Sequence, residues 1–321
     1  MEFGYLPVRS AKEGFKYLWL RQTYPANDGL TMYTPTITII GLGNVGTALL
    51  HALTDAGYGV HSVFSRSEID DKWKESFSQT IFYSSLPASG TECGELIFLS
   101  VKDEAIESVS NQLCKAIDLK GKTLVHCSGT YVSDILMPAK KEGAFTASMH
   151  PLKAVTKSSR TFADSWFDVE GDENAVLLLE QIVARLNAKC LPISADAKPY
   201  LHASAVVASN YIVVLAELVS RISSEADLDK RTIIEALMPL MRSTLSNIEE
   251  LGPADALTGP VARGDAATIA KHLELLKNNS QVLYLYKQLG LVAADLAERQ
   301  SLGTEAANKI RKLFNDEEKK P

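Results

Sequence analysis

The sequence lacks the features that mark metal-binding, membrane and nucleic-acid-binding proteins. Its four cysteines have no CxxC spacing and its six histidines form no HxxxH or HExxH pair, so a zinc site is not expected. No apolar run approaches the roughly 20 residues that span a bilayer. The net charge of −6 offers no basic surface to nucleic acid or anionic lipid. We therefore expect a cytoplasmic protein with reduced thiols and with neither nucleic acid nor membrane as a partner.

The first 31 residues stand apart from the rest of the chain. They are aromatic and mildly basic, and they lack the apolar core of a signal peptide. A second methionine, Met32, stands just before the first strong strand pattern. We expect residues 1–31 to be an upstream start or a short appended arm, dispensable for folding and for cofactor binding.

Short apolar segments alternate with stretches of helical spacing between Thr36 and Ile193. This alternation predicts parallel βαβ units with helices on both faces of a sheet. The expected strands are Thr36–Ile40, Val60–Phe64, Thr80–Tyr83, Leu96–Val101, Thr123–Cys127 and Ala144–Met149, with Trp166–Val169 and Cys190–Ile193 as edge pieces. The expected fold is therefore a doubly wound, mostly parallel α/β sheet domain over residues 32–194.

The remaining chain, residues 195–321, shows no convincing strand. Its spacing predicts an all-α domain with a boundary near Ser194–Lys198. The expected helices are Pro199–Glu225, Asp229–Leu251, Asp265–Leu289 and Gly290–Gln300, followed by a last helix before a charged tail.

A glycine-rich turn joins the first expected strand to the first helix. Its sequence is Gly41-Leu42-Gly43-Asn44-Val45-Gly46, a GxGxxG pattern. In this context the first glycine permits the tight turn, the second lets backbone approach a pyrophosphate, and the third allows close helix–strand packing. The turn predicts a dinucleotide cofactor.

The end of the second strand indicates which dinucleotide is bound. An NAD-specific site usually offers a carboxylate to the ribose 2′-hydroxyl at this place, whereas this chain has Ser65-Arg66-Ser67. A guanidinium flanked by hydroxyls favours a 2′-phosphate, so we expect NADP. The alternative is that Arg66 is an exposed loop residue without a ligand.

Two later strand ends are candidates for the nicotinamide end of the cofactor. Val101 ends the fourth expected strand and Lys102 follows it, and Ser128 follows the strand "TLVHC". The crevice rule for open sheets makes these positions plausible, although a plain loop role is equally open for each.

Polar residues that lie within two apolar segments of the sequence are the candidate catalytic groups. His150 ends a strand just before Pro151, and His202 and Asn210 lie on one face of the helix "LHASAVVASNYIVVL". Buried polar groups require partners, which are protein, water or ligand. A histidine that only caps a strand and a polar network that only pins the helix are the structural alternatives.

The combination of "GLGNVG", "HCSGT", "SMHPLKAV", "KPYLHASAVVASNYIVVL" and "ALTGPVARGDAATIAKHLELL" resembles Rossmann-like oxidoreductase homologues whose C-terminal helical domain is of unknown function. This family is similar to ketopantoate reductases, pyrroline-5-carboxylate reductases and 6-phosphogluconate-type dehydrogenases. The resemblance implies NADP in the first domain, a small-molecule substrate against the helical domain, and a homodimer formed through that domain. Lys198 and Asn210 are the nearest equivalents of the residue that binds the substrate carbonyl in related reductases, but their spacing departs from the ketopantoate reductase pattern.

These features together predict an NADP-dependent oxidoreductase that reduces a small oxo or imino compound in a cleft between the domains. His150 or His202 is the expected proton donor, and Asn210 and Lys198 are the expected orienting groups. Two alternatives stay open: a non-catalytic NADP-binding sensor or assembly protein, and a deazaflavin-linked NADP oxidoreductase.

Overall fold

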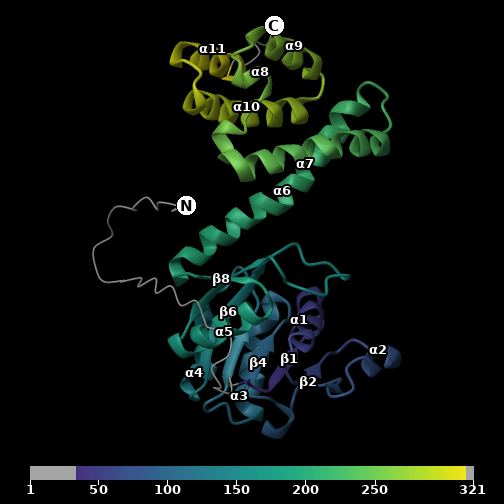
Figure 1. Cartoon of the computed structure of the whole chain (residues 1–321), viewed down its shortest axis with the longest axis vertical. Helices are drawn as coiled ribbons and strands as arrows, with labels where there is room; N and C mark the ends of the chain where they lie inside the picture. The colour runs from purple at the N-terminus through teal and green to yellow at the C-terminus, as the bar shows by residue number, and fades with distance from the viewer. Residues whose placement is uncertain (1–33, 316–321) are drawn as a thin grey trace, which may run out of the picture.

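The computed structural model describes residues 34–315 of the chain, so the expectation about residues 1–31 lies outside the described residues. The described chain has two parts, an eight-stranded sheet with helices on both faces and a helical domain at the end of one long helix (Figure 1). This architecture confirms the predicted α/β fold class.

The sheet has the strand order β3-β2-β1-β4-β5-β6-β7-β8. Strands β1 to β6 are parallel, β7 runs antiparallel to β6, and β8 is parallel to β7. Consequently the first six strands end at one common edge. The strands are β1 (Ile37–Ile40), β2 (Val60–Phe64), β3 (Ile81–Tyr83), β4 (Leu96–Leu99), β5 (Thr123–His126), β6 (Phe145–Leu152), β7 (Trp166–Gly171) and β8 (Lys189–Pro192).

Two apolar layers hold this sheet. On one face, α1 (Asn44–Asp55) and α5 (Glu173–Arg185) bury leucine and isoleucine side chains against alternate residues of the strands. On the other face, α3 (Ile106–Ala116), the 3₁₀ turn η3 (Ser133–Leu136) and α4 (Met137–Lys141) do the same. Because both faces are covered, the central strands are continuous apolar runs rather than alternating ones. The shorter elements are α2 (Asp71–Glu75), η1 (Gly90–Glu92), η2 (Asp103–Ala105) and η4 (Ala195–Ala197).

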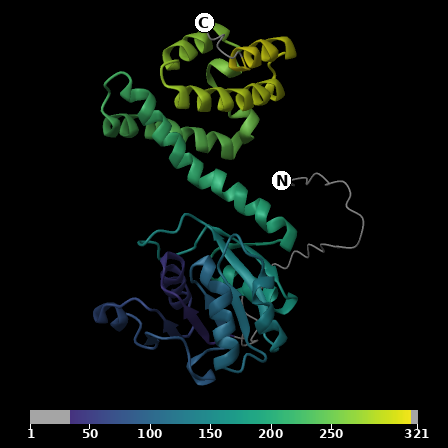
Figure 2. The same ribbon diagram turned by 180° about the vertical axis from the view of Figure 1, so that it is seen from behind.

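The long helix α6 (Lys198–Ser224) leaves the sheet domain and carries the rest of the chain. Figures 1 and 2 show it crossing the space between the sheet and the other helices. Those helices pack on one another and on the far part of α6, with α10 at their centre. They are α7 (Lys230–Asp255), α8 (Gly259–Ala262), α9 (Ala266–Leu276), α10 (Ser280–Gln300) and α11 (Thr304–Asn315).

The helix boundaries correct one sequence expectation. The predicted helices Asp265–Leu289 and Gly290–Gln300 are divided at the wrong place, because the break lies between Leu276 and Ser280. The Asn279 side chain accepts a hydrogen bond from the Val282 amide and so caps α10. Gly290 lies inside α10, where the ring of Phe314 packs over it: a Cβ there would stand 2.4 Å from Cζ.

A second correction concerns α6. Within the described residues, Ala195–Ser224 is long and apolar enough to cross a membrane, with a mean hydropathy of 1.6 and only 11% of the window buried. The expectation that no apolar run approaches this length overlooked it because serine, asparagine and histidine interrupt the apolar letters without adding a fixed charge between Pro199 and Ala216. The charge-free stretch is about 27 Å long at 1.5 Å per residue.

The Gly290–Phe314 contact yields a test of helical-domain packing. Alanine for glycine inside a helix ordinarily stabilises it by about 1 kcal/mol. Because a methyl group would collide with the Phe314 ring, we expect Gly290→Ala to lower the melting temperature instead. A Phe314→Leu background should remove most of that loss. Circular dichroism melting curves measure both effects, and a higher melting temperature for Gly290→Ala in the otherwise unchanged chain would contradict the packing.

Candidate active site

The glycine turn at the end of β1 is built as the sequence predicts. Gly41 has φ +102°, a conformation that side chains rarely adopt, and a Cβ there would stand 2.3 Å from the Ser100 carbonyl oxygen. A Cβ on Gly46 would stand 2.0 Å from the Gly41 carbonyl oxygen. Both glycines therefore allow the turn, the end of β4 and the start of α1 to pack closely.

Gly43 differs from its two neighbours because nothing lies within 4 Å of where its Cβ would be. It is the N-cap of α1, no side chain caps the helix there, and the first turn of α1 contains no acidic residue. Amide groups at such a helix start attract an anion. The turn thus fits the pyrophosphate of a dinucleotide, and its other members, Leu42, Asn44 and Val45, frame it. Leu42 and Val45 pack on the core, while Asn44 Nδ2 donates to the Val155 carbonyl oxygen at 3.1 Å.

The predicted 2′-phosphate group lies one strand away, after β2. Ser65 is half-buried, and Arg66 and Ser67 are exposed. The Ser67 amide donates to Ser65 Oγ at 3.3 Å, which shapes the loop. Arg66 forms no salt bridge with any residue from 34 to 315. Its guanidinium therefore remains available to a ligand.

The predicted nicotinamide-side residues follow the next strands along the sheet. Val101, after β4, reaches the glycine turn, since its Cγ1 lies 3.1 Å from where a Gly41 Cβ would stand. Lys102 is exposed. Ser128, after β5, is buried, and its Oγ accepts hydrogen bonds from the amides of Thr130 and Tyr131 at 3.1 and 3.2 Å. Ser128 Oγ therefore stabilises the loop that follows β5.

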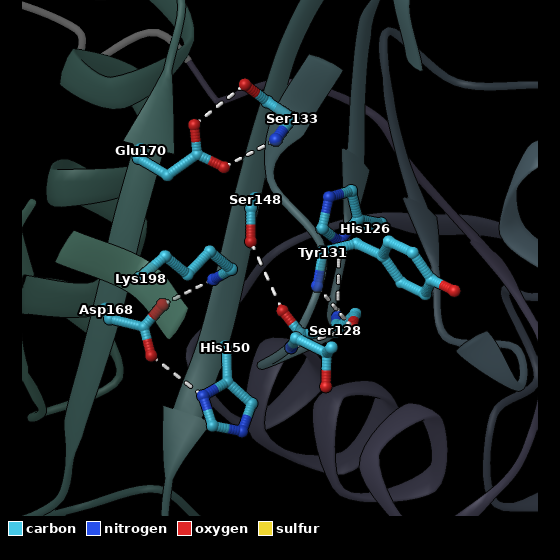
Figure 3. Close-up of polar contacts among 10 residues, drawn as sticks. His126, Ser128, Tyr131, Ser133, Ser148, His150, Asp168, Glu170 and Lys198 are labelled. Carbon is cyan, nitrogen blue, oxygen red and sulfur yellow. Dashed lines mark hydrogen bonds and ion pairs between the residues drawn. The ribbon is translucent and has the colours of Figure 1, made fainter. Parts of the chain in front are cut away.

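His150 of β6 is the centre of a buried polar chain. Its Nδ1 lies 2.8 Å from Oδ2 of Asp168, which is directly opposite on β7. The other carboxylate oxygen, Oδ1, accepts a hydrogen bond from Lys198 Nζ at 2.6 Å. Lys198 and Asp168 are only 1% and 2% exposed. Figure 3 shows Asp168 lying between the lysine and the histidine.

The electrostatics of Asp168 follow from these contacts. Burial alone would raise the pKa of this carboxyl group, but the hydrogen bond with His150 and the charge and hydrogen bond of Lys198 lower it below its ordinary value. The carboxylate is therefore ionised and accepts both hydrogen bonds. Lys198 was predicted to contact substrate, yet its ammonium group is buried against Asp168. Its position corrects that expectation, because an ammonium group held in this way orients the carboxylate instead.

His202 joins the same site from α6. Lys198 and His202 are four residues apart, so they lie on one face of the first turns of this helix. The His202 ring lies edge-on to His150 with 5.8 Å between the ring centroids. Gly129 makes room for both rings, because a Cβ there would stand 2.5 Å from His202 Nδ1 and 2.8 Å from His150 Nε2. His202 Nδ1 is buried and has no hydrogen-bond partner among the described residues.

Asn210 is not brought into this group. It is exposed on α6, and eight residues of helix separate it from His202 by about 12 Å. The helices beyond α6 pack away from the sheet (Figures 1 and 2). Within one chain the wall facing His150 is thus the start of α6, and no helix from α7 onward closes over it.

Sequence reasoning missed Asp168, together with His126, Ser148 and Glu170 of a polar row on the sheet that also contains the predicted His150. This polar seam consists of side chains paired across β5, β6 and β7 on the face that η3 covers: His126, Ser148, His150, Asp168 and Glu170. Glu170 accepts hydrogen bonds from the Ser133 amide and Oγ at 2.6 and 2.8 Å, and burial raises its pKa. The alternation of acidic and apolar residues in "FDVE" was the available signal, because it puts both acids on one face of a buried strand.

Two family models match consecutive parts of the chain, a Rossmann-like domain over residues 22–151 and a domain of unknown function, DUF2520, over residues 165–293. The chain combines these two domains. His150 belongs to the first match, whereas Asp168 and Lys198 belong to the second. The polar chain therefore joins the two matched regions. No curated protein matches the chain.

Solved structures share the fold over most of the chain. Protein TM1727 from Thermotoga maritima is 26% identical with a TM-score of 0.65, covering 83% of this chain and 99% of that one. Protein BF3122 from Bacteroides fragilis, provisionally assigned as an NADP oxidoreductase, is 22% identical with a TM-score of 0.63 and the same coverage, 83% and 99%. An NADP-bound pyrroline carboxylate reductase from Plasmodium falciparum is 15% identical with a TM-score of 0.55, covering 87% and 98%.

The polar seam makes stability depend on pH through His126. Its Nδ1 accepts a hydrogen bond from the Ser128 amide at 3.2 Å, and burial lowers its pKa from 6.5 to about 4. The folded state therefore favours the neutral ring. The preference for a neutral His126 ring contributes fully to the free energy of unfolding above pH 6.5. This contribution is lost at about 1.4 kcal/mol per pH unit as the pH falls from 6.5 toward 4.

We expect His126→Asn, which retains an acceptor for the Ser128 amide, to remove this dependence. Between pH 7 and pH 5 the unchanged protein should lose about 2 kcal/mol more unfolding free energy than the variant. Urea unfolding of the sheet domain at both pH values measures the difference. Equal losses in the two proteins would show that His126 does not titrate abnormally.

Proposed function

We propose that the protein is an NADP-dependent oxidoreductase that reduces a small oxo or imino compound. One observation carries this proposal: the candidate groups occupy the same edge of the sheet in the spatial order β2, β1, β4, β5, β6. The ends of β2, β1, β4 and β5 are followed by Arg66, Gly43, Val101 and Ser128 in turn, and His150 lies in the last part of β6. Neighbouring strands are about 4.8 Å apart, so the row is long enough for an extended dinucleotide with a substrate at one end.

The similar solved structures support this proposal. The Plasmodium falciparum pyrroline carboxylate reductase has NADP bound, and a reductive aminase from Aspergillus terreus, 16% identical with a TM-score of 0.55, is in complex with NADPH and a keto ester, ethyl levulinate. Both are reductases of the same fold. We also propose a cytoplasmic location, where the four cysteines would stay free thiols.

The chain's own residues would perform three tasks. Gly43 and the start of α1 would hold the pyrophosphate, and Arg66 would bind the 2′-phosphate. Bound NADPH supplies a hydride, that is, two electrons and one hydrogen. Reduction of a C=O or C=N bond also needs a proton on the oxygen or nitrogen, and His150 or His202 would deliver it from the facing side of the site.

A direct assay separates this function from cofactor binding alone. The purified full chain is mixed with NADPH and a panel of 2-oxo acids, ketones and cyclic imines, and loss of NADPH absorbance is followed. We expect at least one member to be reduced. Tight NADPH binding without any turnover across the panel would instead favour the alternative of a non-catalytic sensor or assembly protein.

The cofactor preference has its own test. We expect Arg66→Ala to remove a charge-assisted contact worth about 1.5–3 kcal/mol, which weakens NADPH binding by roughly 10- to 150-fold and leaves NADH binding unchanged. Lys72→Ala, which removes an exposed cation from α2, is the matched control and should affect neither cofactor. Calorimetry measures the six affinities of the three proteins for the two cofactors. Equal affinity of the unmodified protein for NADPH and NADH would contradict the assignment.

We further propose that the protein is a homodimer and that the second copy covers α6. Val207, Tyr211 and Val214 lie on one face of this helix and are 57%, 54% and 49% exposed. Contiguous exposed apolar surface of this kind marks an interface. We favour a second copy over a membrane because Ser209 and Asn210 are exposed midway along the same helix, where lipid could not satisfy them.

Sedimentation tests this assembly. The double variant Val207→Asp/Val214→Asp should convert a dimer into a monomer. Leu275→Asp, the same kind of change at an exposed leucine of α9, is the control and should leave the dimer intact. An unmodified chain that sediments as a monomer, or that floats with lipid vesicles, would overturn the proposal.

A further inference from the structure

The two histidines of the site, His150 and His202, differ in the hydrogen bonds that hold their rings. His150 Nδ1 is bonded to Asp168, and Asp168 is bonded to Lys198. His202, by contrast, has no carboxylate bonded to it in the described chain, and its Nδ1 is buried without a partner. A histidine that transfers protons needs a fixed tautomer, and a partner on the second ring nitrogen sets that tautomer. Only His150 has such a partner.

We propose that Asp168 and Lys198 are positioning residues that fix His150 as the proton donor, a proposal that rests on the reductase function above. An ionised carboxylate can only accept hydrogen bonds, so its contact with His150 requires the proton on Nδ1. The Nε2 atom then faces Gly129 and the site, where it can release a proton to substrate and take one up again. Asp168 stays ionised throughout and stabilises the charged ring.

Lys198 is necessary because Asp168 is almost wholly buried. A carboxylate without a counter-charge at such a place would take up a proton and lose its ability to hold Nδ1–H. The Lys198 ammonium group supplies that charge and donates a hydrogen bond to the second carboxylate oxygen, Oδ1, at 2.6 Å. The other titratable groups around His150 are His202 on α6, His126 on β5 and Glu170 on β7. Glu170 is bonded to Ser133 of η3 and not to the histidine.

Asparagine at position 168 makes this geometry testable. Its side chain has one acceptor oxygen and one donor NH₂ group. Because protonated Lys198 can only donate, the oxygen of Asn must face the lysine, and the NH₂ group must then face His150. The ring can receive that donor only on an unprotonated Nδ1. Asp168→Asn should therefore move the proton of neutral His150 from Nδ1 to Nε2.

Removing the lysine as well should reverse the change. In the double variant Asp168→Asn/Lys198→Met no donor claims the amide oxygen, so the oxygen is free to accept from Nδ1–H again. Glu170→Gln is the matched control, because it removes a buried carboxyl group from the same face of β7 without touching the bond to His150. Lys198→Met alone removes the counter-charge, so Asp168 should take up a proton and donate it to Nδ1, which leaves the proton of the neutral His150 ring on Nε2.

The experiment reads the tautomer of His150 from side-chain ¹⁵N chemical shifts of the full chain, without cofactor or substrate, at a pH where the ring is neutral. We expect Nδ1–H in the unchanged protein, in the double variant and in Glu170→Gln, and Nε2–H in Asp168→Asn and in Lys198→Met. An Nε2–H tautomer in the unchanged protein, or an Nδ1–H tautomer in Lys198→Met, would overturn the proposal. The Lys198→Met measurement decides the matter even if Asp168→Asn does not fold.

Turnover provides the second readout. Asp168→Asn should lower kcat for NADPH-dependent reduction by about 10²-fold or more with little change in KM or in NADPH affinity, since proton transfer contributes about 10²–10⁴-fold. The double variant should recover at least tenfold of that loss. Full turnover in Asp168→Asn would contradict the positioning role and leave the reductase function standing. Correct tautomers without turnover on any substrate would refute the reductase function alone.

Discussion

The buried ion pair between Lys198 and Asp168 is the constraint on which the rest of the site depends. Burying a single charge is costly unless a partner of opposite charge is close, and these two side chains are 1% and 2% exposed. Lys198 is the first residue of α6, and Asp168 lies on β7 opposite His150. One contact therefore attaches the interdomain helix to the sheet and holds the histidine ring. Removing either partner would leave the other group buried without its counter-charge.

The sheet topology explains why this contact lies where a reaction could occur. Parallel strands β1 to β6 end at one edge, and the antiparallel return of β7 brings Asp168 beside the end of β6. The glycine turn with its open side at Gly43 lies three strands from β6 along the same edge. The glycine turn and His150 therefore lie along the same edge of the sheet, and His202 at the start of α6 lies beside His150.

The sequence predicted those elements that local patterns determine. Short apolar runs between glycine and polar turns specified the strands, and the spacing of Gly41, Gly43 and Gly46 specified the cofactor turn. Asp168 escaped because its importance comes from β7 lying antiparallel beside β6, a pairing that no local pattern encodes. Lys198 was singled out for its place on the helix, but its direction depends on that same pairing. The break at Asn279 was missed because Gly290 is the stronger local signal, and only the Phe314 ring explains why that glycine is tolerated inside a helix.

A crystal structure of the full chain with NADP bound tests the central claim most directly, because one electron-density map reports both the cofactor and the polar chain. The account predicts the pyrophosphate at Gly43, the 2′-phosphate against Arg66, and the nicotinamide toward Ser128 and His150, with the Lys198–Asp168–His150 chain unbroken. A dinucleotide bound in the reverse direction or away from this edge would contradict it. So would a His150 ring turned away from Asp168 in the presence of the cofactor.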